Sequence, residues 1–375
     1  MKKRIVLFAN SDWYLFNFRL PLIQEIQKSD CDLWLISPAG PYGQKLVEMG
    51  LNWHPIHLDR SSINIFAEFK AIFQLRNFIK SNKIDLVHGF TIKCSIYTAL
   101  ASLRLEVLNI FSITGMGYVF TSKDFKAKLL KPFLWSLLNI SLNKKNAHLI
   151  VQNKDDLNLF ISSNLIEESR ISLIPSSGVD CSRFIPTNAA YNSSNLNVLL
   201  SARLLWDKGI STFVECAEMI IHERDDITFY LAGAIDKNNP ASISIEQVNA
   251  WNNQGIINYL GHIDDMPNLL NKIDIAVLPS AREGLPKSLI EALACGIPII
   301  TTDVPGCREV VENGFDGILI QYGRPSELKQ AIEFLISNPE KYNRFSKNAR
   351  ISALSKFDSK IVNKHTLEIY KSLFS

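Results

Sequence analysis

No apolar run in this chain of 375 residues reaches the ~18 residues that a membrane-spanning helix requires. The six cysteines, at positions 31, 94, 181, 216, 295 and 307, include no C-x-x-C pair. Such scattered cysteines indicate no disulfide framework and are typical of a reducing cytoplasm. Low-complexity tracts and repeats of solenoid period are also absent.

Two signals of other protein classes are missing near the N-terminus. No G-x-G-x-x-G follows the first predicted strand, Arg4–Asn10, which argues against an NAD-dependent enzyme. Met1-Lys2-Lys3 leads into that strand without a small-residue cleavage site, so we expect no signal peptide. At this length we expect two domains, each with its own hydrophobic core.

The net charge of +3 is unevenly distributed. Residues 1–190 carry 22 Lys and Arg against 15 Asp and Glu, a net +7, and the remainder carries 18 against 22, a net −4. The basic half is therefore expected to face an anionic partner. We expect that partner to be a membrane surface, and we expect no nucleic acid.

The stretch from 273 to 303 predicts one βαβ unit with a strand over 273–278, a helix over 285–295 and a second strand over 297–301. Pro286 suits the first turn of this helix and Gly296 the position after its end. Ligands of such units lie beyond the carboxyl ends of the strands, where a helix N-terminus favours an anion. A phosphate is therefore the expected ligand.

Two carboxylates flank this expected anion site. Glu283 stands in the turn before the helix and Glu291 between one and two turns inside it. At ~1.5 Å per residue the two can address groups roughly 10 Å apart, which suits the two ends of a nucleotide sugar. On spacing alone, the favoured interpretation is that Glu283 is a solvated turn residue and Glu291 a favourable charge near a helix N-terminus.

A second strand-to-helix junction carries two cations. Val198–Ala202 predicts a strand and Ile210–His222 a helix, and Arg203 and Lys208 stand between them. Two cations and two helix N-termini at one crevice can neutralise a diphosphate without a metal ion. Solvated loop cations are the alternative interpretation.

The N-terminal half places polar residues after its predicted strands. Asn17 and Arg19 follow the first strand and either reach a phosphate across a cleft or only cap the next helix. His88 is expected at the carboxyl end of a strand over 84–87, with Lys93 beyond it, although a lone histidine is equally well structural.

Later in the same half, Thr114 and Gly115 follow a predicted strand over 107–113, where glycine lets the backbone approach a ligand closely. Asp30-Cys31-Asp32 precedes a strand and so lies on the wrong edge for a ligand, and we expect no metal site there.

A basic, aromatic segment precedes the middle of the chain. Residues 122–145 contain six Lys and one Asp, interleaved with Phe, Leu and Trp, and 125–142 predict a helix. Because a basic amphipathic helix can lie in the headgroup layer, we expect residues 123–135 to contact the cytoplasmic membrane surface. The later part of this helix can equally pack in the core.

The motifs E-G-L-P-K-S-L-I-E, with A-L-A-C-G-I-P-I-I after it, and R-x4-K resemble those of the retaining GT-B glycosyltransferases of family 4. The stretches N-F-R and T-G-M-G-Y-V-F are similar to the subgroup that extends undecaprenyl-diphosphate-linked sugars, often with an N-acetylhexosamine. The T-x-H-G motif of many relatives lacks its His here. The resemblance implies an α/β GT-B fold of two facing Rossmann-like domains, with the following parts: an acceptor domain over 1–187, a nucleotide-sugar domain over 188–356 and a helix over 357–375 that crosses back.

The resemblance also implies roles for individual residues. The implied catalytic residues are Glu283, Arg203, Lys208 and His88. The implied donor-binding residues are Arg203, Lys208, Ile263, Glu283, Gly284, Leu285, Pro286, Lys287 and Glu291. The implied acceptor-binding residues are Asn17, Arg19, His88, Lys93, Thr114 and Gly115.

The implied reaction moves a sugar from a UDP-sugar to a polyprenyl-diphosphate-linked saccharide with retention of anomeric configuration. It requires no cofactor and no metal, and it takes place at the inner face of the cytoplasmic membrane. Two alternatives stay open: an enzyme like UDP-N-acetylglucosamine 2-epimerase, and a nucleotide-sugar-binding protein without turnover.

Overall fold

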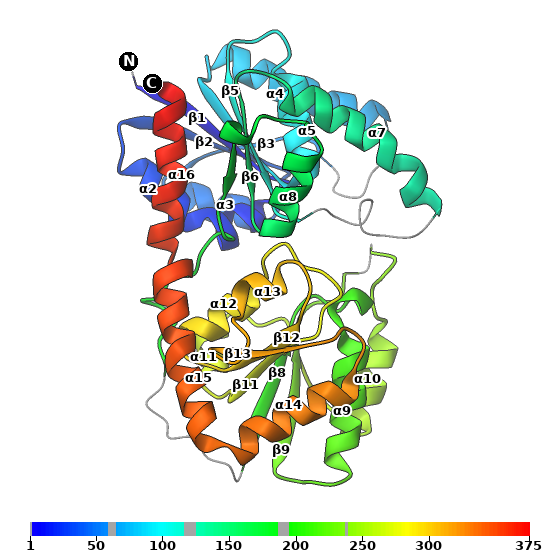
Figure 1. Ribbon diagram of the computed structural model, residues 1–375. Coiled ribbons are helices and arrows are strands. Elements are labelled where there is room, and N and C mark those ends of the chain that lie inside the picture. Colours follow the sequence, from blue (N-terminus) through cyan, green and yellow to red (C-terminus); the bar gives the residue numbers. More distant parts are fainter. Residues whose placement is uncertain (1, 59–64, 116–124, 187–194, 237–238) are drawn as a thin grey trace. The chain divides into compact units, whose positions relative to one another are not determined.

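The computed structural model describes residues 2–58, 65–115, 125–186, 195–236 and 239–375, with the backbone alone at 65 and 125–130. The chain forms two compact units (Figure 1). The first consists of Met1–Ser177 together with Val362–Ser375, and the second of Gly178–Ile361. The division after Ser177 comes earlier in the chain than the domain boundary that the sequence predicts at 187.

The first unit is built on a seven-stranded parallel sheet in the order β3-β2-β1-β4-β5-β6-β7. Its strands are β1 (Lys3–Phe8), β2 (Cys31–Ser37), β3 (Asn52–Pro55), β4 (Leu86–Phe90), β5 (Leu108–Ile113), β6 (Ala147–Val151) and β7 (Ile171–Leu173). β1 and β4 are neighbours although β2 and β3 separate them in sequence. The chain therefore reverses its direction of travel across the sheet between these two strands.

Helices cover both faces of this sheet because alternate residues of each strand point to opposite faces. Val6 and Phe8 of β1 face the core that packs under α4, α5 and α7, and Ile5 and Leu7 face the core under α2 and α16. The helices are α1 (Asp12–Tyr14), the π-helix η1 (Leu15–Arg19), α2 (Leu20–Gln27), α3 (Pro41–Glu48), α4 (Ile65–Ser81), α5 (Thr91–Ala101), α7 (Phe125–Leu142), α8 (Lys154–Ser162), η2 (Glu168–Arg170) and α16 (Ser359–Phe374).

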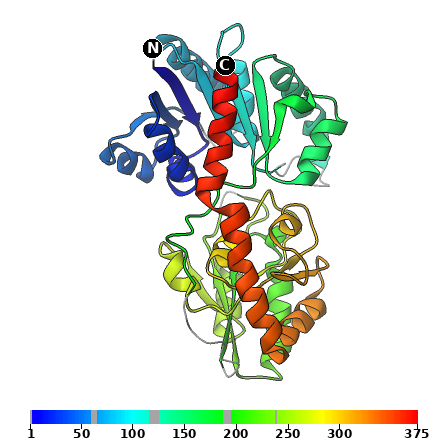
Figure 2. The same ribbon diagram turned by 60° about the vertical axis from the view of Figure 1, so that its left-hand side comes forward.

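Figure 2 shows the C-terminal part of α16, in red, lying along the sheet of the first unit. Among the contacts that hold it there, the Lys3 ammonium lies 4.9 Å from the Phe374 ring, and Tyr370 is buried in the core of this unit. This packing explains why residues from Val362 onward belong to the first unit.

The second unit contains a six-stranded parallel sheet in the order β10-β9-β8-β11-β12-β13. Its strands are β8 (Leu196–Ser201), β9 (Ile227–Ala232), β10 (Asn258–Gly261), β11 (Ile275–Leu278), β12 (Ile299–Thr302) and β13 (Gly317–Ile320). Its helices are η3 (Trp206–Lys208), α9 (Ile210–Ile221), α10 (Ile245–Asn253), α11 (Met266–Leu270), α12 (Lys287–Ala294), α13 (Cys307–Val310), α14 (Pro325–Ser337), α15 (Pro339–Ser352) and η4 (Ala353–Phe357).

Two local predictions are wrong. β4 continues to Phe90 because Gly89 and Phe90 still pair with β5, so His88 lies inside the strand and not at its carboxyl end. Helix α12 begins at Lys287, so Pro286 is its N-cap and stands before the first turn. Within the described ranges, no helix is long and apolar enough to cross a bilayer.

Candidate active site

The two motif-bearing loops of the second unit leave neighbouring parallel strands, β8 and β11, and therefore emerge at one edge of the sheet. Gly209 allows them to meet: its φ is +72°, and a Cβ there would lie 1.9 Å from the Pro279 carbonyl oxygen. The Ala281 N–H donates to the Asp207 carbonyl at 2.8 Å. Backbone contact thus fixes the R-x4-K loop against the turn before α12.

Lys208 and Glu283 form an ion pair at this contact. The Lys208 Nζ lies 2.7 Å from Glu283 Oε1, and each side chain is only 13% exposed. The backbone of Glu283 packs against the segment after β12. The Glu283 N–H donates to the Pro305 carbonyl at 3.0 Å, and a side chain at position 306 would clash with the Glu283 carbonyl, so glycine is required there. The structure therefore brings together one predicted cation and one predicted acid.

Arg203 points to a residue that the motifs do not contain. Its Nη1 lies 2.9 Å from Asp236 Oδ2, in the loop after β9, and its side chain is 47% exposed. The guanidinium is thus positioned by one carboxylate and still reaches solvent. An aspartate in an irregular loop carries no sequence signal that would single it out.

The N-terminus of α12 stands beside this pair of loops. Its N-cap, Pro286, makes no side-chain capping bond, and Leu285 before it is buried. One turn further, Glu291 is 14% exposed and lies 3.7 Å from the Lys287 ammonium. Burial raises the pKa of Glu291, and the charges of Lys287 and Arg183 oppose that rise.

Two further predicted donor residues lie in the same unit. Gly284 precedes Leu285 in the turn before α12, and Ile263 is partly buried against the core under that helix. Arg183, which the sequence reasoning missed, approaches Glu291 from the segment before β8.

The first unit buries Arg19 next to aromatic rings. Its residue exposure is 6%, its Nε and Nη2 donate to the Tyr14 hydroxyl at 3.2 and 2.7 Å, and its guanidinium lies 4.2 Å from the Phe90 ring. Asn17, in contrast, donates to the Trp13 carbonyl of its own helical segment. Asn17 and Arg19, which the sequence analysis treats together, therefore have different partners in the structure.

His88 is enclosed within the first unit. It is 1% exposed, its Nδ1 lies 2.6 Å from the Tyr370 hydroxyl and its Nε2 lies 2.6 Å from Ser112 Oγ. Burial, followed by the charge of Arg19, lowers its pKa well below the usual range, so the ring is neutral. A buried, neutral imidazole with both nitrogens in hydrogen bonds orients its neighbours.

The other predicted acceptor residues are dispersed. Lys93 Nζ forms an ion pair with Glu68 at 2.9 Å, and Thr114 and Gly115 follow β5 without regular structure. In the predicted membrane segment, 123–124 lie outside the described residues and 125–130 are described by backbone alone. Beyond them on α7, Phe133 is 61% exposed, whereas Leu134 and Trp135 pack against the core.

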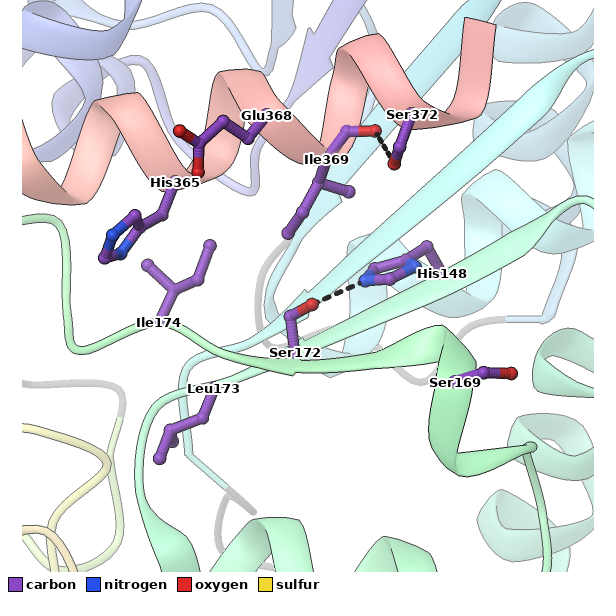
Figure 3. A pocket seen from close by; sticks show the side chains of 9 residues that line it. All are labelled: His148, Ser169, Ser172, Leu173, Ile174, His365, Glu368, Ile369 and Ser372. Carbon is purple, nitrogen blue, oxygen red and sulfur yellow. Dashed lines mark hydrogen bonds between the residues drawn. The ribbon is translucent and has the colours of Figure 1, made fainter. Parts of the chain in front are cut away.

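A surface pocket of about 470 Å³ opens between α16 and the edge strand β7 (Figure 3). Its lining combines hydroxyl, imidazole, carboxylate and aliphatic groups from Ser169, Ser172, Leu173, Ile174, His148, His365, Glu368, Ile369 and Ser372. Two of these lining residues are hydrogen-bonded, with His148 Nε2 2.9 Å from Ser172 Oγ. None of the predicted donor-binding or acceptor-binding residues lines this pocket.

Comparison with known protein families identifies the class of enzyme to which this chain belongs. The family model for glycosyl transferases group 1 matches residues 185–352, and that for glycosyl transferase 4-like domains matches residues 4–153. The chain belongs to the group 1 glycosyltransferases and is an enzyme of the GT-B fold class.

The chain is also similar to individual glycosyltransferases. The chain is 30% identical to the N,N'-diacetylbacillosaminyl-diphospho-undecaprenol alpha-1,3-N-acetylgalactosaminyltransferase of Campylobacter jejuni, over 98% of each chain. It is 28% identical to the UDP-Gal:alpha-D-GlcNAc-diphosphoundecaprenol alpha-1,3-galactosyltransferase of Escherichia coli, over 79% of this chain and 78% of that one. The crystal structure of Anabaena HepE in complex with UDP has the same fold, with a TM-score of 0.77 at 18% identity over 99% of this chain and all of that one.

Proposed function

We propose that the enzyme transfers a hexose, in particular an N-acetylhexosamine, from a UDP-sugar to an undecaprenyl-diphosphate-linked saccharide. The observation that carries this proposal is the meeting of Lys208 with Glu283 beside the N-terminus of α12. The names of the Campylobacter and Escherichia relatives support the lipid-linked acceptor, and the UDP in the Anabaena structure supports the donor nucleotide.

The proposed chemistry places developing negative charge at the second unit. As the bond from the sugar to UDP breaks, charge grows on the leaving diphosphate, and the positive groups at that edge include Lys208, Arg203 and the N-terminus of α12. Interactions that strengthen in the transition state are the ones that accelerate the reaction. Glu283 then orients the transferred sugar and Glu291 the ribose.

The reaction retains the anomeric configuration in this proposal, and the leaving phosphate itself accepts the proton of the acceptor hydroxyl. No cofactor and no metal ion is assigned a role. Arg203 and Lys208 supply the positive charge that a divalent cation provides in other sugar transferases.

The acceptor is assigned to the first unit, through Arg19, Thr114, Gly115 and their neighbours. We also propose that the enzyme is cytoplasmic and peripheral on the inner membrane face, with contact through residues 123–135. The exposed Phe133 of α7 supports this membrane contact.

A direct assay tests the proposed function. The purified chain is incubated with each of a panel of UDP-sugars and a synthetic polyprenyl-diphosphate sugar, and products are identified by mass spectrometry. We expect one donor to lengthen the acceptor by one sugar. A new nucleotide sugar formed without acceptor would instead identify an epimerase, and UDP binding without any transfer would identify a binding protein.

A further inference from the structure

Arg19 is a buried cation of the first unit. Within the described part of the chain no carboxylate pairs with it, and its hydrogen bonds go to the neutral Tyr14 hydroxyl. With the guanidinium 4.2 Å from the Phe90 ring, the residue is 6% exposed. Desolvating an uncompensated charge is costly, and an anionic ligand would offset this cost.

The location of Arg19 beside the last residue of β4 also indicates an anionic ligand. Phe90 is the last residue of β4, and β4 pairs with β1 where the strand order reverses. Ligands of open α/β sheets bind at this switch point, outside the carboxyl ends of the strands. Arg19 itself ends the π-helix η1, a type of element that is frequent at functional sites.

The start of α5 adds a second feature at the same point. This helix of 11 residues begins at Thr91, and its N-cap Phe90 makes no side-chain capping bond. Thr91 has a φ of +77°, a strained conformation for a β-branched residue. The N-terminus of such a helix favours negative charge.

The buried residues behind Phe90 hold this arrangement in place. His88 lies with its ring 4.1 Å from that of Phe90 and is fixed by Tyr370 and Ser112. Tyr14, which binds the guanidinium, is stacked on Phe18 at 5.1 Å. Arg19 is thus pre-positioned by aromatic and hydroxyl groups, and no carboxylate of the described residues neutralises its charge.

We propose that Arg19 and the N-terminus of α5 bind the diphosphate of a substrate, carried either by the polyprenyl lipid or by the nucleotide. This assignment rests on the proposed function for the identity of the substrate. A guanidinium binds a phosphate through parallel charge-assisted hydrogen bonds, which a point charge cannot reproduce.

Calorimetric titration with geranyl diphosphate and, separately, with UDP tests the site. We expect Arg19→Met to weaken geranyl diphosphate binding about tenfold or more while UDP binding stays unchanged. The affinity of Arg19→Lys for geranyl diphosphate should lie between those of wild type and Arg19→Met. The control is Lys28→Met, which removes an exposed cation paired with Glu25. Loss of UDP affinity alone would identify the nucleotide as the source of the diphosphate.

The proposal would be overturned if Arg19→Met bound geranyl diphosphate and UDP each as tightly as the wild type does. Should Arg19→Met fail to fold, Tyr14→Phe keeps the cation and removes its hydrogen-bond acceptor, and we then expect weaker geranyl diphosphate binding with an unchanged UDP affinity. Binding is measured without turnover, so failure of this site and failure of the transfer reaction are distinguishable.

A separate observation concerns α4. Phe66, Phe69 and Phe73 are 87%, 66% and 62% exposed, and their spacing places them on one side of the helix. We call these residues the α4 stripe. Lys70 is exposed beside them, and Glu68, the acid of the first turn, is paired with Lys93. Large exposed aromatic groups together mark an interaction surface.

We infer that the α4 stripe inserts into the headgroup layer of an anionic bilayer. Aromatic rings beside an exposed lysine match this layer, and the half of the chain that contains α4 carries the positive excess. The stripe belongs to the first unit, the unit to which the lipid-linked acceptor is assigned.

Vesicle flotation tests this surface. The triple variant Phe66→Ser, Phe69→Ser, Phe73→Ser is expected to lose about tenfold of its affinity for phosphatidylglycerol vesicles. Phe334→Ser, at an exposed phenylalanine of the second unit, is the matched control and is expected to bind like wild type. Unchanged binding of the triple variant would overturn the inference, as would a loss of self-association in sedimentation without a loss of vesicle binding.

Discussion

The ammonium of Lys208 lies 2.7 Å from the carboxylate of Glu283, although the two residues are 75 positions apart in the chain. Both side chains are 13% exposed, so the pair is shielded from solvent but still accessible to a ligand. A diphosphate can replace the carboxylate as the partner of Lys208, which leaves Glu283 to accept a hydrogen bond from a sugar hydroxyl. In the proposed function, the pair would thereby link capture of the phosphate to orientation of the sugar.

Replacing Lys208 by methionine should reduce turnover more than substrate affinity. The cation is proposed to act on charge that develops on the leaving group, so we expect kcat to fall about 100-fold with KM for the UDP-sugar changed only a few-fold. Steady-state kinetics measure this split. Lys356→Met removes an exposed cation of the same unit and should leave both constants unchanged.

Arg203→Ala should show the same pattern with a smaller effect. Its side chain is 47% exposed and its guanidinium is paired with Asp236, so we expect a loss of about tenfold in kcat. A transfer rate equal to that of wild type in both Arg203→Ala and Lys208→Met would refute the assignment of this site.

Glu291→Gln should stabilise the fold while it weakens nucleotide binding. Burial raises the pKa of Glu291, so the folded protein binds this proton more tightly than the unfolded chain. Stability is then highest below the unfolded pKa and falls as pH rises through the folded value. The glutamine variant lacks this penalty, and we expect a higher Tm at pH 8.

The same variant should bind UDP about tenfold more weakly, because an amide accepts fewer hydrogen bonds from the ribose hydroxyls than a carboxylate. Differential scanning calorimetry and UDP titration give the two results. A lower Tm together with unchanged UDP affinity would contradict both parts of the prediction.

Acid should destabilise the first unit partly through His148. Burial and the charge of Arg170 lower its pKa to about 4, whereas the unfolded chain titrates near 6.5. Between these values only the unfolded state binds the proton, so stability is lost as pH falls from about 6.5 to about 4. In urea titrations, His148→Asn should reduce this loss by on the order of 2 kcal/mol, and equal pH slopes would contradict the cause.

Chelation should leave transfer intact. Since Arg203 and Lys208 are proposed to carry the charge of the diphosphate, we expect initial rates with EDTA to lie within about twofold of those without it. Abolition of turnover by EDTA, with recovery on addition of a divalent ion, would contradict this part of the proposal.

The second unit could be predicted from sequence more completely than the first. Gly296 and Pro286 bracket α12, and the strand-to-helix alternation places both motif loops at one edge, so the meeting of Lys208 with Glu283 follows from local patterns and sheet order. Asp236 could not be predicted, because its partnership with Arg203 depends on how two irregular loops pack.

In the first unit, the location and the partners of His88 depend on tertiary contacts. Its strand extends three residues beyond the predicted end at 87, and Tyr370, whose hydroxyl hydrogen-bonds with the His88 ring, is 282 positions away. No local pattern encodes such a pairing. Arg19 was selected from sequence as a phosphate ligand or a helix cap, and the structure adds that it is buried without an acidic partner among the described residues.

A crystal structure of the protein soaked with UDP in the presence of EDTA tests the central claim most directly. We expect the diphosphate to lie within hydrogen-bond distance of Lys208, Arg203 and the N-terminus of α12, with the ribose at Glu291. Electron density for UDP anywhere else, or an empty site at a saturating UDP concentration, would contradict the claim.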